Sequence, residues 1–138
     1  MAPVEITTVV FCEDIRREIS NKDILIGVYS GNILLPSFPS TFNVAFWLEA
    51  VSNEVGPKEL EFRIRLGGGG AVLNVGLNFA EPNQPAGIGL PTVQIMADKP
   101  DELFFEIRDG ENWRVLKQKK VLQTGTPINQ PTVSAPPS

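Results

Sequence analysis

The chain has 138 residues, of which 42% are hydrophobic and 20% are charged, and these proportions exclude collagen, coiled coils and wholesale disorder. Its net charge of -4 argues against a surface dedicated to duplex nucleic acid, which needs clustered Lys and Arg. The chain has no histidine and a single cysteine, so it lacks the commonest general base and cannot form an internal disulfide or a cysteine-based zinc site.

The first part of the chain predicts two strands with an ambiguous segment between them. Val4–Cys12 is mostly apolar, and Ile24–Tyr29 is the nearly continuous apolar run that is typical of a central strand. Residues 13–19 fit a helical turn as well as a strand, because apolar residues recur there both at every fourth position and in partial alternation. We favour a strand that turns at Ser20–Asp23, since those residues are turn formers.

The middle of the chain alternates between apolar and polar residues in three segments, 41–51, 59–66 and 71–79. Alternation with a period of two predicts strands that have one buried face and one solvated face. The side chains predicted to point inward are Phe42, Val44, Phe46, Leu48, Ala50, Leu60, Phe62, Ile64, Leu66, Ala71, Leu73, Val75, Leu77 and Phe79. Between the last two segments, Gly67–Gly70 predicts a hairpin loop.

The last third of the chain predicts one more strand, a hairpin and a tail. Residues 87–96 form a strand that Pro91 places at an edge or a bulge. The Asp109-Gly-Glu turn lies between two alternating segments and predicts a hairpin. Its inward face is expected to carry four apolar side chains, which are Phe105, Ile107, Trp113 and Val115.

These elements predict an all-β chain, an antiparallel β-sandwich or a partly open barrel of about eight or nine short strands. Residues 1–123 form one domain. Residues 124–138 contain several prolines and no charge, and they predict an extended tail.

Three short motifs resemble the N-terminal signature of a family of small bacterial proteins of unknown function. They are Phe11-Cys-Glu-Asp-Ile-Arg16, Leu25-Ile-Gly-Val-Tyr29 and Phe38-Pro39, which correspond to the family's F-C-[DE]-D-I-R, L-I-G-V-Y and short F-P loop. The resemblance implies a β-sandwich and carries no catalytic residue over to this chain.

Neither export nor a membrane span is predicted. No basic segment precedes the first apolar stretch, which Glu5 and Glu13 interrupt. Residues 24–48 carry no charge, but prolines and many polar groups among them do not suit hydrocarbon. We expect a cytoplasmic protein.

Few residues suit catalysis or ligand binding. Cys12 is followed by two acids, Glu13 and Asp14, which would raise its pKa, and we expect it to pack as a small hydrophobe. The glycine run is not followed by the Lys-Ser or Lys-Thr of a phosphate loop. The one basic concentration consists of Arg114, Lys117, Lys119 and Lys120, and we interpret it as a solvated strand end.

Two aromatic residues fall on faces that should be wet. Trp47 points opposite to Phe46, and Phe104 points opposite to Phe105. Each ring is expected to meet either a covering loop, such as Leu35–Pro39, or a protein partner.

The sequence therefore predicts a non-catalytic interaction or assembly module with no cofactor and no metal, which associates with itself or with another protein through a sheet face at Trp47 and Phe104. Two alternatives stay open. One is a small-ligand-binding sandwich whose pocket is shaped by Gly67–Gly70 and Glu81–Pro85. The other is a hydrolase that pairs carboxylates among Glu13, Asp14 and Glu49.

Overall fold

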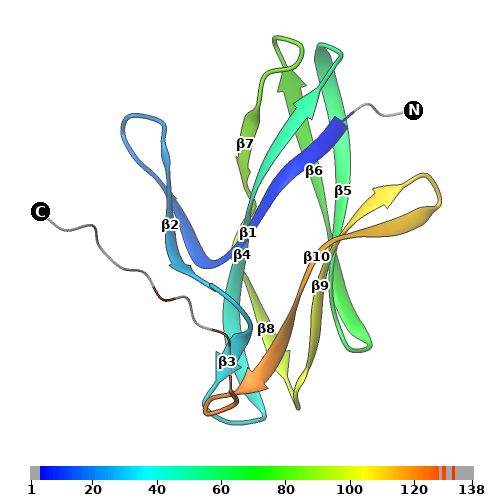
Figure 1. Cartoon of the computed structure of the whole chain (residues 1–138). Coiled ribbons are helices and arrows are strands. Elements are labelled where there is room, and N and C mark those ends of the chain that lie inside the picture. Colours follow the sequence, from blue (N-terminus) through cyan, green and yellow to red (C-terminus); the bar gives the residue numbers. More distant parts are fainter. Residues whose placement is uncertain (1–3, 128, 130–131, 133–138) are drawn as a thin grey trace, which may run out of the picture.

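The structure is a computed structural model that describes residues 4–127, 129 and 132 (Figure 1). These residues contain ten strands and no helix, so no helix in them could cross a membrane. The strands are β1 (Val4–Arg17), β2 (Asp23–Val28), β3 (Ile33–Leu35), β4 (Ser40–Ser52), β5 (Gly56–Leu66), β6 (Gly69–Phe79), β7 (Ala86–Gly89), β8 (Val93–Ala97), β9 (Asp101–Asp109) and β10 (Asn112–Gln123).

The strands form two sheets that pack face to face as an antiparallel β-sandwich, which confirms the predicted fold class (Figure 1). The first sheet has the order β2-β1-β4-β7, and β8 pairs with the other half of β4. The second sheet has the order β3-β10-β9-β5-β6. Every neighbouring pair is antiparallel except β3 and β10, which are parallel.

The ambiguous segment 13–19 is a strand as far as Arg17, which confirms the favoured interpretation of a strand rather than a helical turn. β1 continues to Arg17, and a tight turn follows in which the Glu18 amide donates to the Lys22 carbonyl at 2.8 Å. β2 then returns along β1, with Arg17 opposite Asp23 and Cys12 opposite Val28.

Two features of the strand list differ from the prediction. The predicted strand 87–96 is broken at Pro91 into β7 and β8, and both pieces pair with β4. Proline has no amide to donate to a ladder. The last bond before the break runs from the Leu90 amide to the Phe46 carbonyl at 2.9 Å, and the chain rejoins β4 where Val93 lies opposite Val44. The three-residue strand β3 was not predicted, because its partner β10 lies far away in sequence.

The β9–β10 hairpin corrects the prediction for Trp113 and Val115. Its loop has two residues rather than three, because Asp109 pairs with Asn112. Gly110, at the first loop position, has a φ of 66°, which suits a type II′ turn. The shorter loop shifts the register by one residue, so Trp113 lies opposite Arg108 and shares the outer face with it. Phe105 and Ile107 alone point into the core.

The core between the sheets is centred on a stack of phenylalanines. The Phe46 and Phe105 rings are stacked with their centroids 4.3 Å apart, and Phe62 extends the stack at 5.2 Å from Phe105. Phe11 meets the edge of this group, 4.7 Å from Phe46 in a T-shaped pair. The predicted inward side chains of β4 and β5 are buried except Leu66, which is half-buried.

Two lysines of β10 connect the sheets where β1 and β10 run beside each other. Lys117 donates to the Val9 carbonyl at 2.9 Å, and Lys119 donates to the Gly31 carbonyl at 2.6 Å. Beyond β10 the Thr124 amide donates to the Leu35 carbonyl at 2.8 Å. The predicted tail, 124–138, lies largely outside the described residues.

Candidate interaction surface

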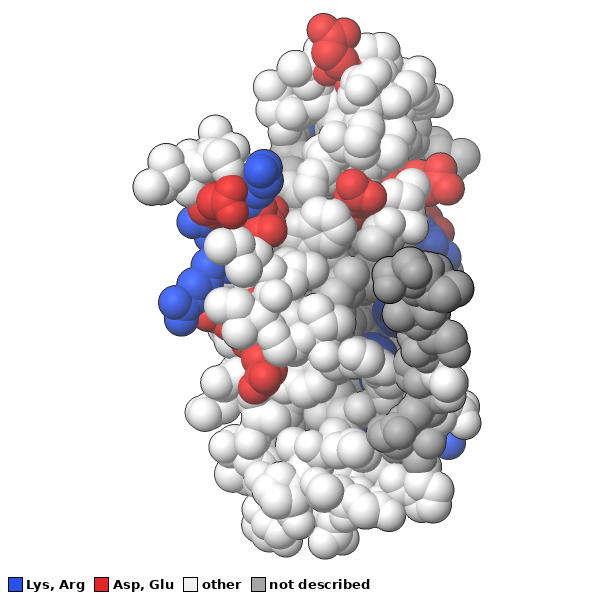
Figure 2. Space-filling view, turned by 60° about the vertical axis from the view of Figure 1, so that its left-hand side comes forward, with Lys and Arg blue, Asp and Glu red and all other residues white. Residues whose placement is uncertain are grey.

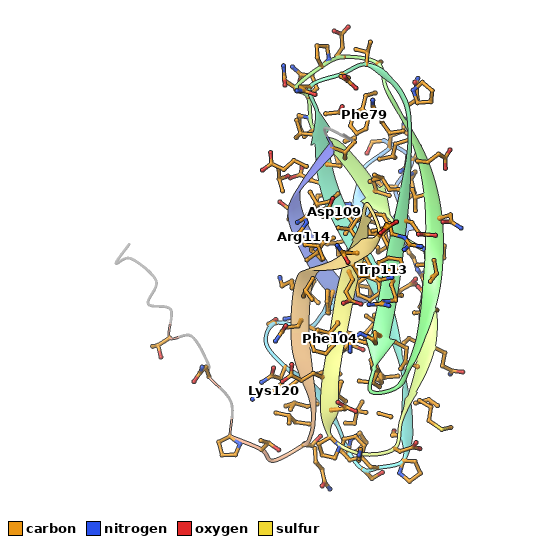
Figure 3. All side chains as sticks on the ribbon, turned by 90° about the vertical axis from the view of Figure 1, so that its right-hand side faces the viewer. Phe79, Phe104, Asp109, Trp113, Arg114 and Lys120 are labelled. Carbon is orange, nitrogen blue, oxygen red and sulfur yellow. The ribbon has the colours of Figure 1, made fainter. Side chains whose placement is uncertain are left out.

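The outer face of the second sheet carries a group of aromatic and charged side chains that we call the aromatic–arginine face. Its members are Arg63 and Arg65 of β5, Phe104, Glu106 and Arg108 of β9, and Trp113 of β10. Strand register brings them together, because Arg63 lies opposite Glu106 and Arg65 lies opposite Phe104. In Figure 3, Trp113 lies near the β9–β10 turn, and Phe104 lies further along the same two strands.

Glu106 anchors this face and is only 3% exposed. Its carboxylate accepts a hydrogen bond from Arg63 Nε at 2.7 Å and a longer one from Arg65 Nε at 3.4 Å. Burial alone would raise the pKa of Glu106, but the hydrogen bonds from the two arginines outweigh it and hold the pKa below its ordinary value of 4.5. The carboxylate is therefore charged at neutral pH, and it fixes both guanidinium groups.

The arginines in turn hold the two aromatic rings. The guanidinium carbons of Arg63 and Arg108 lie 4.6 and 4.8 Å from the centre of the Trp113 ring, and that of Arg65 lies 4.2 Å from the centre of the Phe104 ring. Arg108 Nε also donates to Glu61 at 2.8 Å. Phe104 and Trp113 remain half-buried beneath these guanidinium groups.

The second sheet ends at β6, and we call the side of β6 that no described strand pairs the β6 edge. β6 has eleven residues, Gly69–Phe79, and none of them is charged or a proline. Edge strands usually avoid pairing with other chains by being short or by carrying lysine, proline or a bulge. β6 pairs with β5 without a register shift, and its Val72 is 50% exposed.

A groove with a volume of about 270 Å³ runs between β6 and β8, where the two sheets separate. Its lining is mostly apolar and consists of Ile64, Leu66, Gly69, Gly70, Ala71, Val93, Gln94, Ile95 and Met96. Met96 is 63% exposed. The predicted ligand loops do not meet here, because Gly67–Gly70 begins β6 and Glu81–Pro85 follows its far end. Those ends are roughly 30 Å apart, given the rise of a strand.

Trp47, the other predicted partner-binding residue, lies on the outer side of the first sheet. Its indole Nε1 donates to Asp23 Oδ2 at 3.0 Å, and Asp23 also pairs with Arg17 at 3.4 Å. The ring lies over Gly87, where an added Cβ would be 3.3 Å from Trp47 Cζ2. Trp47 is therefore half-buried by its own chain, on the sheet opposite to Phe104.

The residues considered for catalysis are dispersed. Cys12 is fully buried, and burial raises the pKa of its thiol. Asp14 bonds with Arg16 and Thr92, while Glu49 accepts from Thr8 at 3.4 Å. Glu13 lies against Gly27 of β2. Within residues 4–127, 129 and 132, no three acidic or cysteine side chains are grouped as metal ligands would be.

The basic residues of β10 do not form one patch. Arg114 is near Asp109, with 3.6 Å between Nε and Oδ2. Lys117 instead donates to a carbonyl of β1, and Lys119 donates to a carbonyl of the loop between β2 and β3. Arg114 and Lys120 lie well apart in Figure 3.

Figure 2 shows that the lower end of the molecule, on the face drawn there, is almost free of charged side chains. The charge-free segment 30–41 contributes to that end.

No protein-family model matches this chain, and no curated protein sequence matches it. The N-terminal resemblance thus stays a prediction.

Proposed function

We propose that this chain is a non-catalytic interaction or assembly module that joins further copies of itself, or another protein, through its second sheet. The observation that carries the proposal is the β6 edge, a long strand without charge or proline at the end of an ordered sheet. Such an edge offers unpaired backbone groups to an added strand. The neighbouring aromatic–arginine face keeps the sheet rigid, so little ordering entropy would be lost on association.

The dispersed titratable groups support a role without catalysis. Nucleophilic cysteines need a lowered pKa and access to solvent, and Cys12 has a raised pKa and no exposed surface. A glycosidase-like pair needs two carboxyl groups that face one cleft. The three candidate carboxylates instead have different neighbours: Gly27 for Glu13, Thr92 for Asp14 and Thr8 for Glu49.

The test is the mass of the purified chain in solution, measured by size exclusion coupled to light scattering over a range of concentrations. We expect a multiple of 15.1 kDa at high concentration. A mass of 15.1 kDa at every concentration would contradict self-assembly.

The groove between β6 and β8 favours a second candidate function, the binding of a small apolar ligand. Its volume of about 270 Å³ lies just below the usual range for ligand pockets. Binding would raise the unfolding temperature in the presence of the ligand, so a thermal-shift screen against pooled metabolites and lipids tests it.

A further inference from the structure

The outward charged side chains of β5 follow an ordered pattern beside the β6 edge. Along β5 the outward residues are first acidic, Glu59 and Glu61, and then basic, Arg63 and Arg65. These four lie next to four outward residues of β6, in the order Gly76, Asn74, Val72 and Gly70. The side chains of β5 beside β6 are therefore acidic at one end and basic at the other, and only Glu59 among them has no charged partner in the described residues.

We propose that the β6 edge pairs with the β6 edge of a second copy of this chain, antiparallel and about a two-fold axis near Leu73. The two second sheets then form one continuous sheet. This inference rests on the proposed function and names the partner that binds the β6 edge, a second copy of the chain. A two-fold axis reverses the order of the charges, so the acidic end of one copy faces the basic end of the other. A parallel arrangement would need an axis along the strand, which turns one copy over and puts its outward charges on the opposite side of the joined sheet, so it would gain no such attraction.

The outer side of such a pair has room for the charges to approach one another. With the axis at Leu73, Gly70 lies opposite Gly76 of the second copy, and no side chain stands between Arg65 and Glu59 of the second copy. Glu59 already leans toward the edge, because a Cβ on Gly76 would lie 3.1 Å from Glu59 Oε1. Glu59 is exposed and is in no ion pair with a described residue. Three strand spacings, about 14 Å, separate β5 of one copy from β5 of the other, so these charges would favour the antiparallel pair by a weak long-range attraction that is strongest at low salt.

The inner side of the pair would use the groove beside β8. Leu73, Val75 and Leu77 are only half-buried, because no strand of residues 4–127 pairs with β6 on that side. An added antiparallel β6 would bring its own apolar residues to the same inner side, next to Ile95 and Met96 of the groove. The pairing therefore covers apolar surface that one copy leaves open.

The ladder between β5 and β6 shows which backbone groups are available. Leu66 and Gly69 close a two-residue loop and pair directly, so hydrogen-bonded pairs recur from there at every second residue. Gly70, Val72, Asn74 and Gly76 occupy the other positions and direct their amides away from β5. A proline at position 74 would therefore remove an amide at the free edge and leave the β5 ladder complete.

The experiment compares Asn74→Pro with its matched control Asn74→Ser by size exclusion with light scattering. We expect about twice 15.1 kDa for the wild type and for Asn74→Ser, and 15.1 kDa for Asn74→Pro. Circular dichroism and thermal unfolding must show that Asn74→Pro is folded. Glu59→Arg, an exposed substitution, serves as a second blocking variant and should weaken self-association roughly threefold at low salt, because it replaces attraction by repulsion between arginines in two rows.

Removal of the facing arginine provides the rescue. The double variant Glu59→Arg/Arg65→Gln should associate more tightly than Glu59→Arg alone, since it removes the like charge without placing a second carboxylate beside the buried Glu106. Phe104 is on β9, two strands away from β6, so Phe104→Ala should leave the mass of the assembly in solution unchanged.

The outcomes separate this inference from the proposed function. If the wild type is multimeric and Asn74→Pro has the same mass, or if only Phe104→Ala lowers the mass, the β6 pairing is wrong but the proposed assembly is not contradicted. A wild type that is monomeric at every concentration overturns both.

Discussion

Arg63 Nε donates to Glu106 Oε1 at 2.7 Å, from one strand to the next, on a carboxylate whose side chain is only 4% exposed. Few acids are so buried on the outer face of a sheet, and this one is covered by the arginines that it binds. The pair links β5 to β9, which are the two strands that join the β6 edge to the rest of the second sheet.

Removal of the Glu106 carboxylate should destabilise the fold. We expect Glu106→Ala to lower the free energy of unfolding by about 2–3 kcal/mol at pH 7, because two partly buried guanidinium groups lose their acceptor. Glu106→Gln keeps one oxygen acceptor and should cost less. Urea denaturation measures both values, and equal stability of Glu106→Ala and the wild type would contradict this role.

The same carboxylate should make stability depend on pH in the acid range. The pKa of Glu106 is lower in the folded state than its ordinary value of 4.5, so the folded state binds fewer protons. Its contribution is fully present above pH 4.5 and is lost as the pH falls through the folded-state pKa. The difference in unfolding free energy between wild type and Glu106→Gln should therefore shrink below pH 4.5 and be constant above it.

Neighbouring phenylalanines of β9 should differ strongly in their contribution to stability. Phe105 is fully buried in the ring stack, and we expect Phe105→Ala to cost about 3–5 kcal/mol. Phe104 is half-buried under Arg65, so Phe104→Ala should cost only about 1 kcal/mol. Chemical denaturation of the two variants side by side provides the test, and similar costs would mean that the register of β9 is wrong.

That contrast shows which parts of the fold are predictable from local sequence. Alternation identified the inward side of β4 and β5 correctly, because each residue's face follows from its position in a strand. It misplaced Trp113 because the face of β10 depends on whether the hairpin loop has two or three residues. Periodicity alone does not decide that number.

The candidate surface was only partly predictable for a related reason. Phe104 could be identified as an aromatic residue on a wet face without knowledge of its neighbours. The Glu106–Arg63 pair joins residues 43 positions apart, and the order β9-β5-β6 has no local signal. The parallel pairing of β3 with β10 was missed for the same reason.

The Asp23 carboxylate should hold Trp47 in place. Asp23→Ala removes the acceptor of the indole N–H and the partner of Arg17, so we expect a loss of about 1 kcal/mol and a shift of Trp47 fluorescence to longer wavelength. The measurement is made in a Trp113→Phe background, where Trp47 is the one tryptophan left. Asp23→Asn keeps an oxygen acceptor and should shift the fluorescence less.

Two glycines should respond differently to an added methyl group. Gly110 has a φ of 66°, which alanine adopts only with strain, and Gly110→Ala should cost about 1–2 kcal/mol. An added Cβ at Gly31 meets nothing within 4 Å, so Gly31→Ala should be neutral or slightly stabilising. Thermal melts distinguish the two, and equal effects would argue against the tight β9–β10 turn.

The order in which the strands of the two sheets are synthesised also determines when the chain can complete its core. All strands of the first sheet have been made once Ala97 leaves the ribosome, but the β5–β6 hairpin then still lacks β9. Phe105, the ring that lies between Phe46 and Phe62 in the phenylalanine stack, would be missing from the nascent chain at that point. The growing polypeptide therefore carries an uncovered apolar layer until β9 and β10 emerge, and this interval is the one in which a chaperone would have most to bind.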